Sequence, residues 1–212
     1  MNINEIHEFR KLKEGKKKER DMRAIYDEKW GDRFLVHFFD YVPSRFKNVS
    51  LPLESARTAI WDFKDGKHQS GVALHTAKLI KSIFGAKEAK DITFICIPAS
   101  SPEKNEIRYK EFSKLVCAMS GATNAYYHIT VTGDRIAVHE QGRSKRITSA
   151  QVIEFDEEFF QGRKCLLFDD VVTSGRSLAT FTTKLESMGA EVVGAFCMGK
   201  TLTSPNHPTN EN

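Results

Sequence analysis

The chain has 212 residues, and its Lys and Arg residues exceed its Asp and Glu residues by 32 to 28. This length is enough for one substantial α/β domain with a real core, and the mild basic excess suits an anionic small ligand without indicating nucleic acid. The sequence contains no apolar run long enough to cross a membrane, and residues 1–20 contain no apolar signal core, so we expect a cytoplasmic protein. All four cysteines lie in apolar segments without a CxxC pair, which excludes a zinc ribbon and a dithiol redox site.

Two contrasting patterns occupy the first fifty residues. Residues 4–26 are rich in charge, which is typical of a solvated helix, and a nucleic-acid-binding tail is the alternative. Residues 30–41 concentrate Phe, Leu and Tyr in a helix-length stretch, which we expect to dock on the main domain or to form a dimer contact. The expected organisation is an N-terminal helical extension (1–50), a main domain (51–202) and a disordered tail (203–212).

The main domain opens with two helical patterns and a strand. Apolar residues at helical spacing predict two helices within residues 53–83, and residues 92–97 predict a strand. The strand is followed by a turn of small residues, Pro98-Ala99-Ser100-Ser101, whose main-chain N–H groups a polyanion could reach. An ordinary strand-to-helix turn is the alternative.

A basic pair and a predicted hairpin follow this turn. Lys104 and Arg108 precede a helix expected over 109–119, and their side chains either neutralise phosphate charge or are simply solvated. Residues 125–132 predict a strand of β-branched and aromatic residues. The next segment, 133–148, is either a mobile flap that closes over a ligand or an exposed hairpin with a solvated basic tip. Its basic cluster consists of Arg143, Lys145 and Arg146.

The most informative stretch is residues 164–177, KCLLFDDVVTSGRS. Its apolar run has no alternation, which is typical of a strand covered on both faces of a parallel sheet, and such sheets bind ligands at the carboxyl ends of their strands. A helical pattern continues to Gly189, and residues 192–198 predict a last strand. The expected fold is a three-layer α/β/α structure with a mainly parallel sheet.

The residues after this strand fit a ligand that carries both a phosphate and a diol. Hydroxyl groups, a glycine and the unpaired N–H groups of a helix start suit a phosphate, and they are supplied by Thr173, Ser174, Gly175, Arg176 and Ser177. Asp169 and Asp170 would repel that phosphate, so their expected partners are hydroxyl donors or Mg²⁺. A sugar phosphate of the ribose 5-phosphate kind satisfies both halves of the stretch.

An apolar strand that ends in two acidic residues also occurs in other contexts. A phosphorylated receiver domain carries its Asp-Asp pair near the start of the domain, whereas little chain remains here. A Walker loop is excluded because its first glycine would fall at Asp170 and Arg176 replaces its lysine. A purely structural turn with both acids solvated stays open.

Residues 166–177, LLFDDVVTSGRS, resemble the phosphoribosyl pyrophosphate (PRPP) motif of type I phosphoribosyltransferases. The resemblance implies that the acidic pair, as the catalytic residues, holds the ribose hydroxyls and Mg²⁺, and that residues 173–177 hold the 5-phosphate. It implies a pyrophosphate site formed by Ala99, Ser100, Ser101, Lys104 and Arg108, with the basic segment as the flap. The implied reaction transfers the phosphoribosyl group between PRPP and a nitrogenous base. Oxopurine-salvage enzymes usually have Asp at the position of Thr173, which argues against hypoxanthine or guanine.

Residues 56–67, ARTAIWDFKDGK, resemble the segment before the catalytic core of the ComF-type branch of this family. The chain lacks the cysteine-rich zinc module often found in that branch. The alternative function is a non-catalytic ComF-like protein of DNA uptake or recombination, in which the basic N-terminal segment and the flap bind single-stranded DNA.

Overall fold

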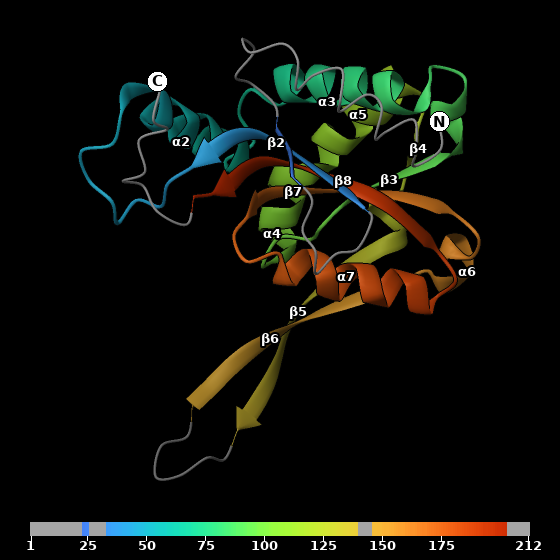
Figure 1. Cartoon of the computed structure of the whole chain (residues 1–212). Coiled ribbons are helices and arrows are strands. Elements are labelled where there is room, and N and C mark those ends of the chain that lie inside the picture. The colour runs from blue at the N-terminus through green and yellow to red at the C-terminus, as the bar shows by residue number, and fades with distance from the viewer. Residues whose placement is uncertain (1–22, 26–32, 140–145, 203–212) are drawn as a thin grey trace.

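The computed structural model describes residues 23–25, 33–139 and 146–202, and its centre is a six-stranded sheet (Figure 1). The strand order is β1-β2-β8-β7-β3-β4, and every neighbouring pair is parallel except β1 with β2. The strands are β1 Arg23–Ile25, β2 Phe34–Tyr41, β3 Ile92–Cys96, β4 Thr123–Asn124, β7 Lys164–Val172 and β8 Glu191–Thr201. The predicted mainly parallel α/β sheet is therefore confirmed.

Helices cover both faces of this sheet (Figure 1). One face is covered by α2 Leu51–Lys64, α3 Gln69–Phe84 and α5 Glu111–Ser120, and the other by α6 Glu157–Phe160 and α7 Arg176–Ser187. The described residues also contain four short helical turns: η2 Glu88–Asp91, α4 Pro102–Asn105, η3 Glu106–Lys110 and η4 Tyr126–His128. The predicted helices within 53–83 correspond to α2 and α3.

The central strand β7 separates two hydrophobic cores. Leu166 and Phe168 point into the core shared with α2, α3 and α5, whereas Cys165 and Leu167 point into the core shared with α6 and α7. Successive side chains of a strand alternate between faces, and burial of both faces explains the unbroken apolar run. Cys117, Cys165 and Cys197 are buried free thiols, as expected from their apolar segments, whereas Cys96 differs from that expectation because it is partly exposed at the end of β3.

The expectation of a helix over residues 30–41 is wrong. Residues Phe34–Tyr41 form β2, which pairs in parallel with β8 inside the main sheet. Phe34 and Val36 enter one core and Leu35 enters the other. The run is apolar throughout because both faces of this strand are covered, and not because it forms a buried helix. The main sheet therefore includes residues before 51. Residues 23–25 form β1 instead of helix, while residues 1–22 and the tail 203–212 lie outside the described residues.

An antiparallel hairpin projects from the body of the molecule (Figure 1). It consists of β5 Ile129–His139 and β6 Arg146–Phe155, with a register shift between Thr132 and Arg135. The strand expected over 125–132 therefore begins later, because the turn η4 precedes it, and it continues through the segment expected to form a flap or hairpin.

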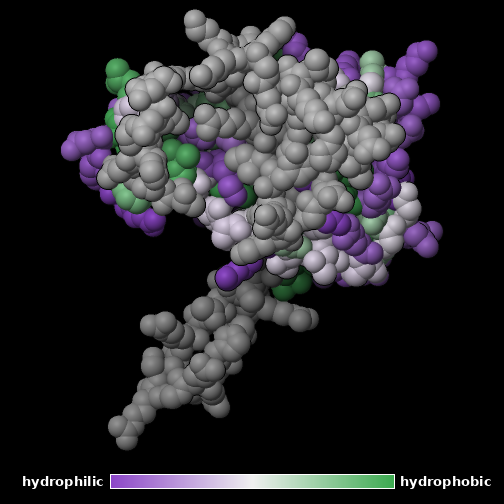
Figure 2. All heavy atoms as spheres, viewed as in Figure 1, coloured by the Kyte–Doolittle hydropathy of each residue, from purple (hydrophilic) through white to green (hydrophobic). Residues whose placement is uncertain are grey.

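On the face shown in Figure 2, the surface of the described residues is mainly hydrophilic, with small hydrophobic spots between the polar side chains. The exposed large hydrophobic residues are Leu51, Trp61, Leu74, Ile107 and Tyr127. Within the described residues, the helices are all too short or too polar to span a membrane.

Candidate functional site at the carboxyl ends of β3 and β7

The site begins where β3 and β7 lie side by side at the same edge of the sheet. Cys96 pairs with Phe168, and the N–H group of Ile97 donates to the carbonyl of Phe168 over 2.8 Å. The turn after β3 and the acidic pair of β7 therefore lie close together, as expected for parallel strands. The structure brings together two segments that are about seventy residues apart in the chain.

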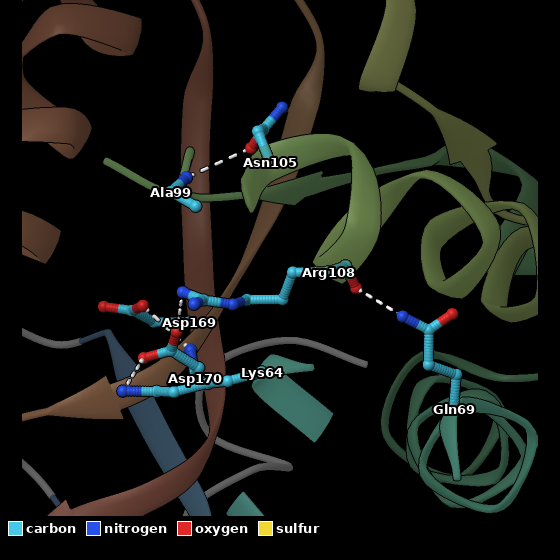
Figure 3. A network of polar contacts seen from close by, with 7 residues as sticks. All are labelled: Lys64, Gln69, Ala99, Asn105, Arg108, Asp169 and Asp170. Carbon is cyan, nitrogen blue, oxygen red and sulfur yellow. Dashed lines mark hydrogen bonds and ion pairs between the residues drawn. The ribbon is translucent and has the colours of Figure 1, made fainter. Parts of the chain in front are cut away.

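Asp170 faces the core of α2, α3 and α5, where it meets two cations (Figure 3). The Arg108 guanidinium donates through Nη1 to Asp170 Oδ2, and Lys64 Nζ lies 3.5 Å from Asp170 Oδ1. Arg108 comes from η3 and Lys64 is the last residue of α2. The Asp170 carboxylate is buried, and both of its oxygens are engaged by these two cations.

Asp169 occupies the opposite face and has a different environment. Its Oδ1 accepts a hydrogen bond of 2.8 Å from the N–H group of Asp170. Burial, followed by the charge of Asp170, raises the pKa of the Asp169 carboxyl to about 7, although the Asp170 N–H group, Lys64 and Arg108 oppose the shift. One carboxylate is therefore neutralised by cations, and its neighbour can change protonation state near neutral pH.

The turn after β7 has the features predicted for a phosphate loop. Gly175 has a φ of 74°, in the left-handed region, and α7 begins at the next residue. Ser174 Oγ accepts a hydrogen bond of 3.4 Å from the N–H group of Arg176. The Thr173 and Ser177 side chains make no hydrogen bond to any described residue and are exposed, so their hydroxyls are accessible to a ligand.

The turn after β3 is more closed than the sequence predicted. The N–H group of Ala99 donates to Asn105 Oδ1 over 3.1 Å, and Ala99 is buried (Figure 3). Ser101 Oγ caps α4 by accepting from the N–H group of Lys104 over 3.3 Å. Ser100 and Lys104 are exposed. Within this turn, the N–H group of Ala99 and the hydroxyl of Ser101 are therefore already used.

The predicted basic flap is only partly visible. Arg143 and Lys145 lie outside the described residues, and Arg146 opens β6 without a described side chain. The structure therefore places a hairpin at the predicted position, and the closing of a flap stays a prediction.

Three contributors to the site were missed by sequence interpretation. Lys64 belongs to the Phe-Lys pair that carries the ComF-type resemblance, so a signal for it existed. Asn105 and Gln69 had no signal, because their roles depend on contacts with Ala99 and with η3 that only the fold creates.

The described residues contain no group of three His, Cys, Asp or Glu side chains able to hold a metal by themselves. A cavity of about 10 Å³ lies beside the end of β3 and has room for no more than one water molecule. Its lining includes Cys96, Asn105 and Tyr126. This cavity is therefore too small for a ligand of the predicted size.

Comparisons with known proteins found one family model and several solved structures. The family model of the phosphoribosyl transferase domain matches residues 67–208. A search of curated proteins gave no match. Three solved structures resemble the fold over about two thirds of the chain.

The first is a hypothetical protein from Neisseria gonorrhoeae with bound ppGpp, at 12% identity and a TM-score of 0.40, covering 67% of this chain and 73% of that one. The second is phosphoribosylpyrophosphate synthetase from Mycobacterium smegmatis, at 16% identity and a TM-score of 0.36. The match covers 65% of this chain and 34% of that one. The third is a hypoxanthine-guanine phosphoribosyltransferase from Bacillus anthracis, at 15% identity and a TM-score of 0.35. The match covers 63% of this chain and 65% of that one. Such low similarity says nothing about the ligand of this chain. The family model, which spans most of the chain and includes the motif of β7, shows that the chain belongs to the phosphoribosyl transferase domain family.

Proposed function

We propose that this chain is a phosphoribosyltransferase that binds PRPP with Mg²⁺ and transfers its phosphoribosyl group to or from a nitrogenous base. The observation that carries the proposal is the juxtaposition, at the end of one buried strand, of two carboxylates and an exposed hydroxyl-rich turn that starts a helix. Hydroxyl donors suit the carboxylates, and a phosphate suits the helix start. The two halves match the two ends of a ribose 5-phosphate.

The residues present fit a magnesium ion that arrives with the ligand. Mg²⁺ is usually held by one or two carboxylates together with substrate phosphates and water, rather than by a cage of protein ligands. Asp169 and Asp170 supply two carboxylates, and the second is paired with Lys64 and Arg108. When bound, the ion would neutralise charge on the pyrophosphate.

Each segment of the site has a proposed role. Asp169 and Asp170 hold the ribose hydroxyls, and residues 173–177 hold the 5-phosphate. Ser100, Ser101, Lys104 and Arg108 face the pyrophosphate, with Ala99 as part of the supporting turn. A cation near a departing pyrophosphate stabilises the charge that develops there, so Arg108 is the residue we expect to contribute most to the rate.

The base is not an oxopurine in this proposal, because Thr173 offers no carboxylate to it. We also propose a ComF-like origin, supported by the way α2 ends in Phe63-Lys64 before a glycine. The DNA-binding alternative requires the charged N-terminal segment (4–26) and the flap (133–148). Most of the former and residues 140–145 of the latter lie outside the described residues, and no described contact favours this alternative.

The direct test is an activity assay with PRPP, Mg²⁺ and a panel of nucleobases, in which pyrophosphate and the nucleotide product are both detected. We expect activity with at least one base, and its loss in the Asp169→Asn/Asp170→Asn double variant. The matched control is Glu157→Gln/Glu158→Gln, an adjacent acidic pair exposed on α6. Absence of both activity and PRPP binding in the wild type would contradict the proposal.

A further inference from the structure

The helical segment that carries Arg108 is irregular at the position of this residue. Residues Glu106–Lys110 form a π-helical turn between α4 and α5. Single π turns inside helices are rare and are often found at functional sites. In this turn, Ile107 is exposed and Tyr109 is buried in the core, and Arg108 extends toward Asp170.

A π turn also changes the hydrogen-bond pattern of the main chain. The register shifts from i+5 to i+4 where the turn meets α5, so a carbonyl at this junction lacks its regular main-chain donor. A buried carbonyl without a donor is costly, and another group must satisfy it. The structure supplies that group from α3.

Gln69, the first residue of α3, donates to the turn with its side-chain amide (Figure 3). Its Nε2 lies 2.9 Å from the carbonyl oxygen of Ile107 and 2.8 Å from that of Arg108. An amide NH₂ group has two hydrogens, so both can be used here. Gln69 is buried at 8% exposure, which indicates a fixed contact rather than a surface one.

The connection between α2 and α3 is packed against the same carbonyl. Gly66 has a φ of 78°, and a Cβ atom added to it would lie 3.0 Å from the Ile107 oxygen. Lys64, two residues before Gly66, reaches Asp170. Lys64, just before this connection, therefore contacts Asp170, and Gln69, just after it, binds the backbone of Arg108.

The Arg108 side chain still has donors for a ligand. Its Nη1 donates to Asp170 and its Nε is buried without a partner among the described residues, whereas its Nη2 makes no hydrogen bond to a described residue and is the donor left for a ligand. A guanidinium carries five N–H donors in a rigid fork, so its usefulness to an anion depends on where the backbone places it.

We propose that Gln69 is a positioning residue for Arg108: by binding the carbonyls of the π turn, it fixes the guanidinium beside Asp170 and toward the pyrophosphate of the ligand. The ligand in this inference rests on the proposed function, whereas the Arg108–Asp170 contact does not. The two can therefore be tested separately.

The first experiment needs no ligand. The interaction energy between Arg108 and Asp170 is measured by urea unfolding of Arg108→Met, Asp170→Asn and the double variant, in the wild-type and Gln69→Glu backgrounds. Glu has the shape of Gln but has no amide donors and repels the two carbonyls. We expect the interaction energy to fall to about half or less in the Gln69→Glu background. An unchanged interaction energy overturns the inference.

The second experiment measures PRPP affinity by calorimetry with Mg²⁺. We expect Gln69→Glu and Gln69→Met to weaken binding about tenfold, as for one misplaced hydrogen bond to a charged group. Neither substitution should weaken binding further in the Arg108→Met background, and Gln161→Glu, an exposed glutamine on the opposite side of the sheet, should bind as the wild type does.

The outcomes separate the two proposals. Equal losses of affinity with and without Arg108 would show that Gln69 acts only on general stability, and would overturn the positioning role. If wild-type protein does not bind PRPP, the proposed function fails, and the ligand-free experiment alone decides on Gln69.

Discussion

The turns after β7 and after β3 lie at the same sheet edge but differ in how their polar groups are used. After β7, the hydroxyls of Thr173 and Ser177 are exposed and α7 begins directly. After β3, Asn105 occupies the N–H group of Ala99, and Ser101 caps α4. The first turn therefore has free hydroxyls for an anion, whereas two polar groups of the second turn are already bonded within the turn and its helix, and Arg108 is paired with Asp170.

The comparison predicts that added negative charge is most harmful after β7. Ser177→Asp should weaken PRPP binding about 100-fold, because a carboxylate close to the 5-phosphate repels it. The free energy of unfolding should stay equal or rise, since an acidic residue in the first turn of a helix is favourable. Calorimetry and urea unfolding measure the two quantities.

The same substitution after β3 is the matched test. Ser101→Asp keeps the cap of α4, because Asp is also a good N-cap residue, and we expect about a tenfold loss of PRPP affinity. An equal loss in both variants would remove the distinction between the two turns.

The two carboxylates should differ in their effect on stability. Asp170→Asn leaves Arg108 and Lys64 without their buried partner and should lower the free energy of unfolding by about 3 kcal/mol. Asp169→Asn removes a carboxylate that is close to a like charge, so it should cost little or stabilise the protein above neutral pH. Urea unfolding of both variants decides this, and equal losses would contradict the account.

Asp169 also predicts a pH dependence of stability. Its pKa is raised in the folded protein from 3.8 to about 7, so the folded state binds the extra proton. This contribution is complete below pH 3.8 and is lost as the pH rises through about 7. The unfolding free energy of the wild type should therefore fall over this interval relative to that of Asp169→Asn. If the unfolding free energies of the wild type and Asp169→Asn differed by the same amount at every pH, burial would not raise the pKa of Asp169.

The smallest effect is expected at Lys104. This side chain is exposed after the closed turn, and exposed charges contribute little, so Lys104→Ala should change PRPP affinity by less than about threefold. Arg108→Met should have a much larger effect in the same titration. Equal losses of PRPP affinity in Lys104→Ala and Arg108→Met would contradict the larger role that we assign to Arg108.

The sequence predicted the elements whose pattern is local. The apolar run before Asp169 predicted β7, and Gly175 followed by a helical pattern predicted the start of α7. Residues 34–41 were misassigned because a short run that is apolar on all sides fits a buried helix and a doubly covered strand equally well. Periodicity could not decide between them, and only pairing with β8 did.

The contacts of the site were less predictable than its motif. The pair of cations on Asp170 joins residues from α2, η3 and β7, which are far apart in the chain. The π turn and its satisfaction by Gln69 depend on the packing of α3 against this segment. These features follow from tertiary packing and leave no periodic signal in the sequence.

The central claim is that the acidic pair holds the ribose hydroxyls while residues 173–177 hold the phosphate. Its most direct test is a calorimetric comparison of ribose 5-phosphate with 2-deoxyribose 5-phosphate, in the wild type and in Asp169→Asn/Asp170→Asn. We predict that the wild type binds the deoxy sugar about tenfold more weakly or worse, as expected for loss of a hydrogen bond to a charged group, and that the double variant does not distinguish the two sugars. Equal affinity of the wild type for both sugars would contradict the account.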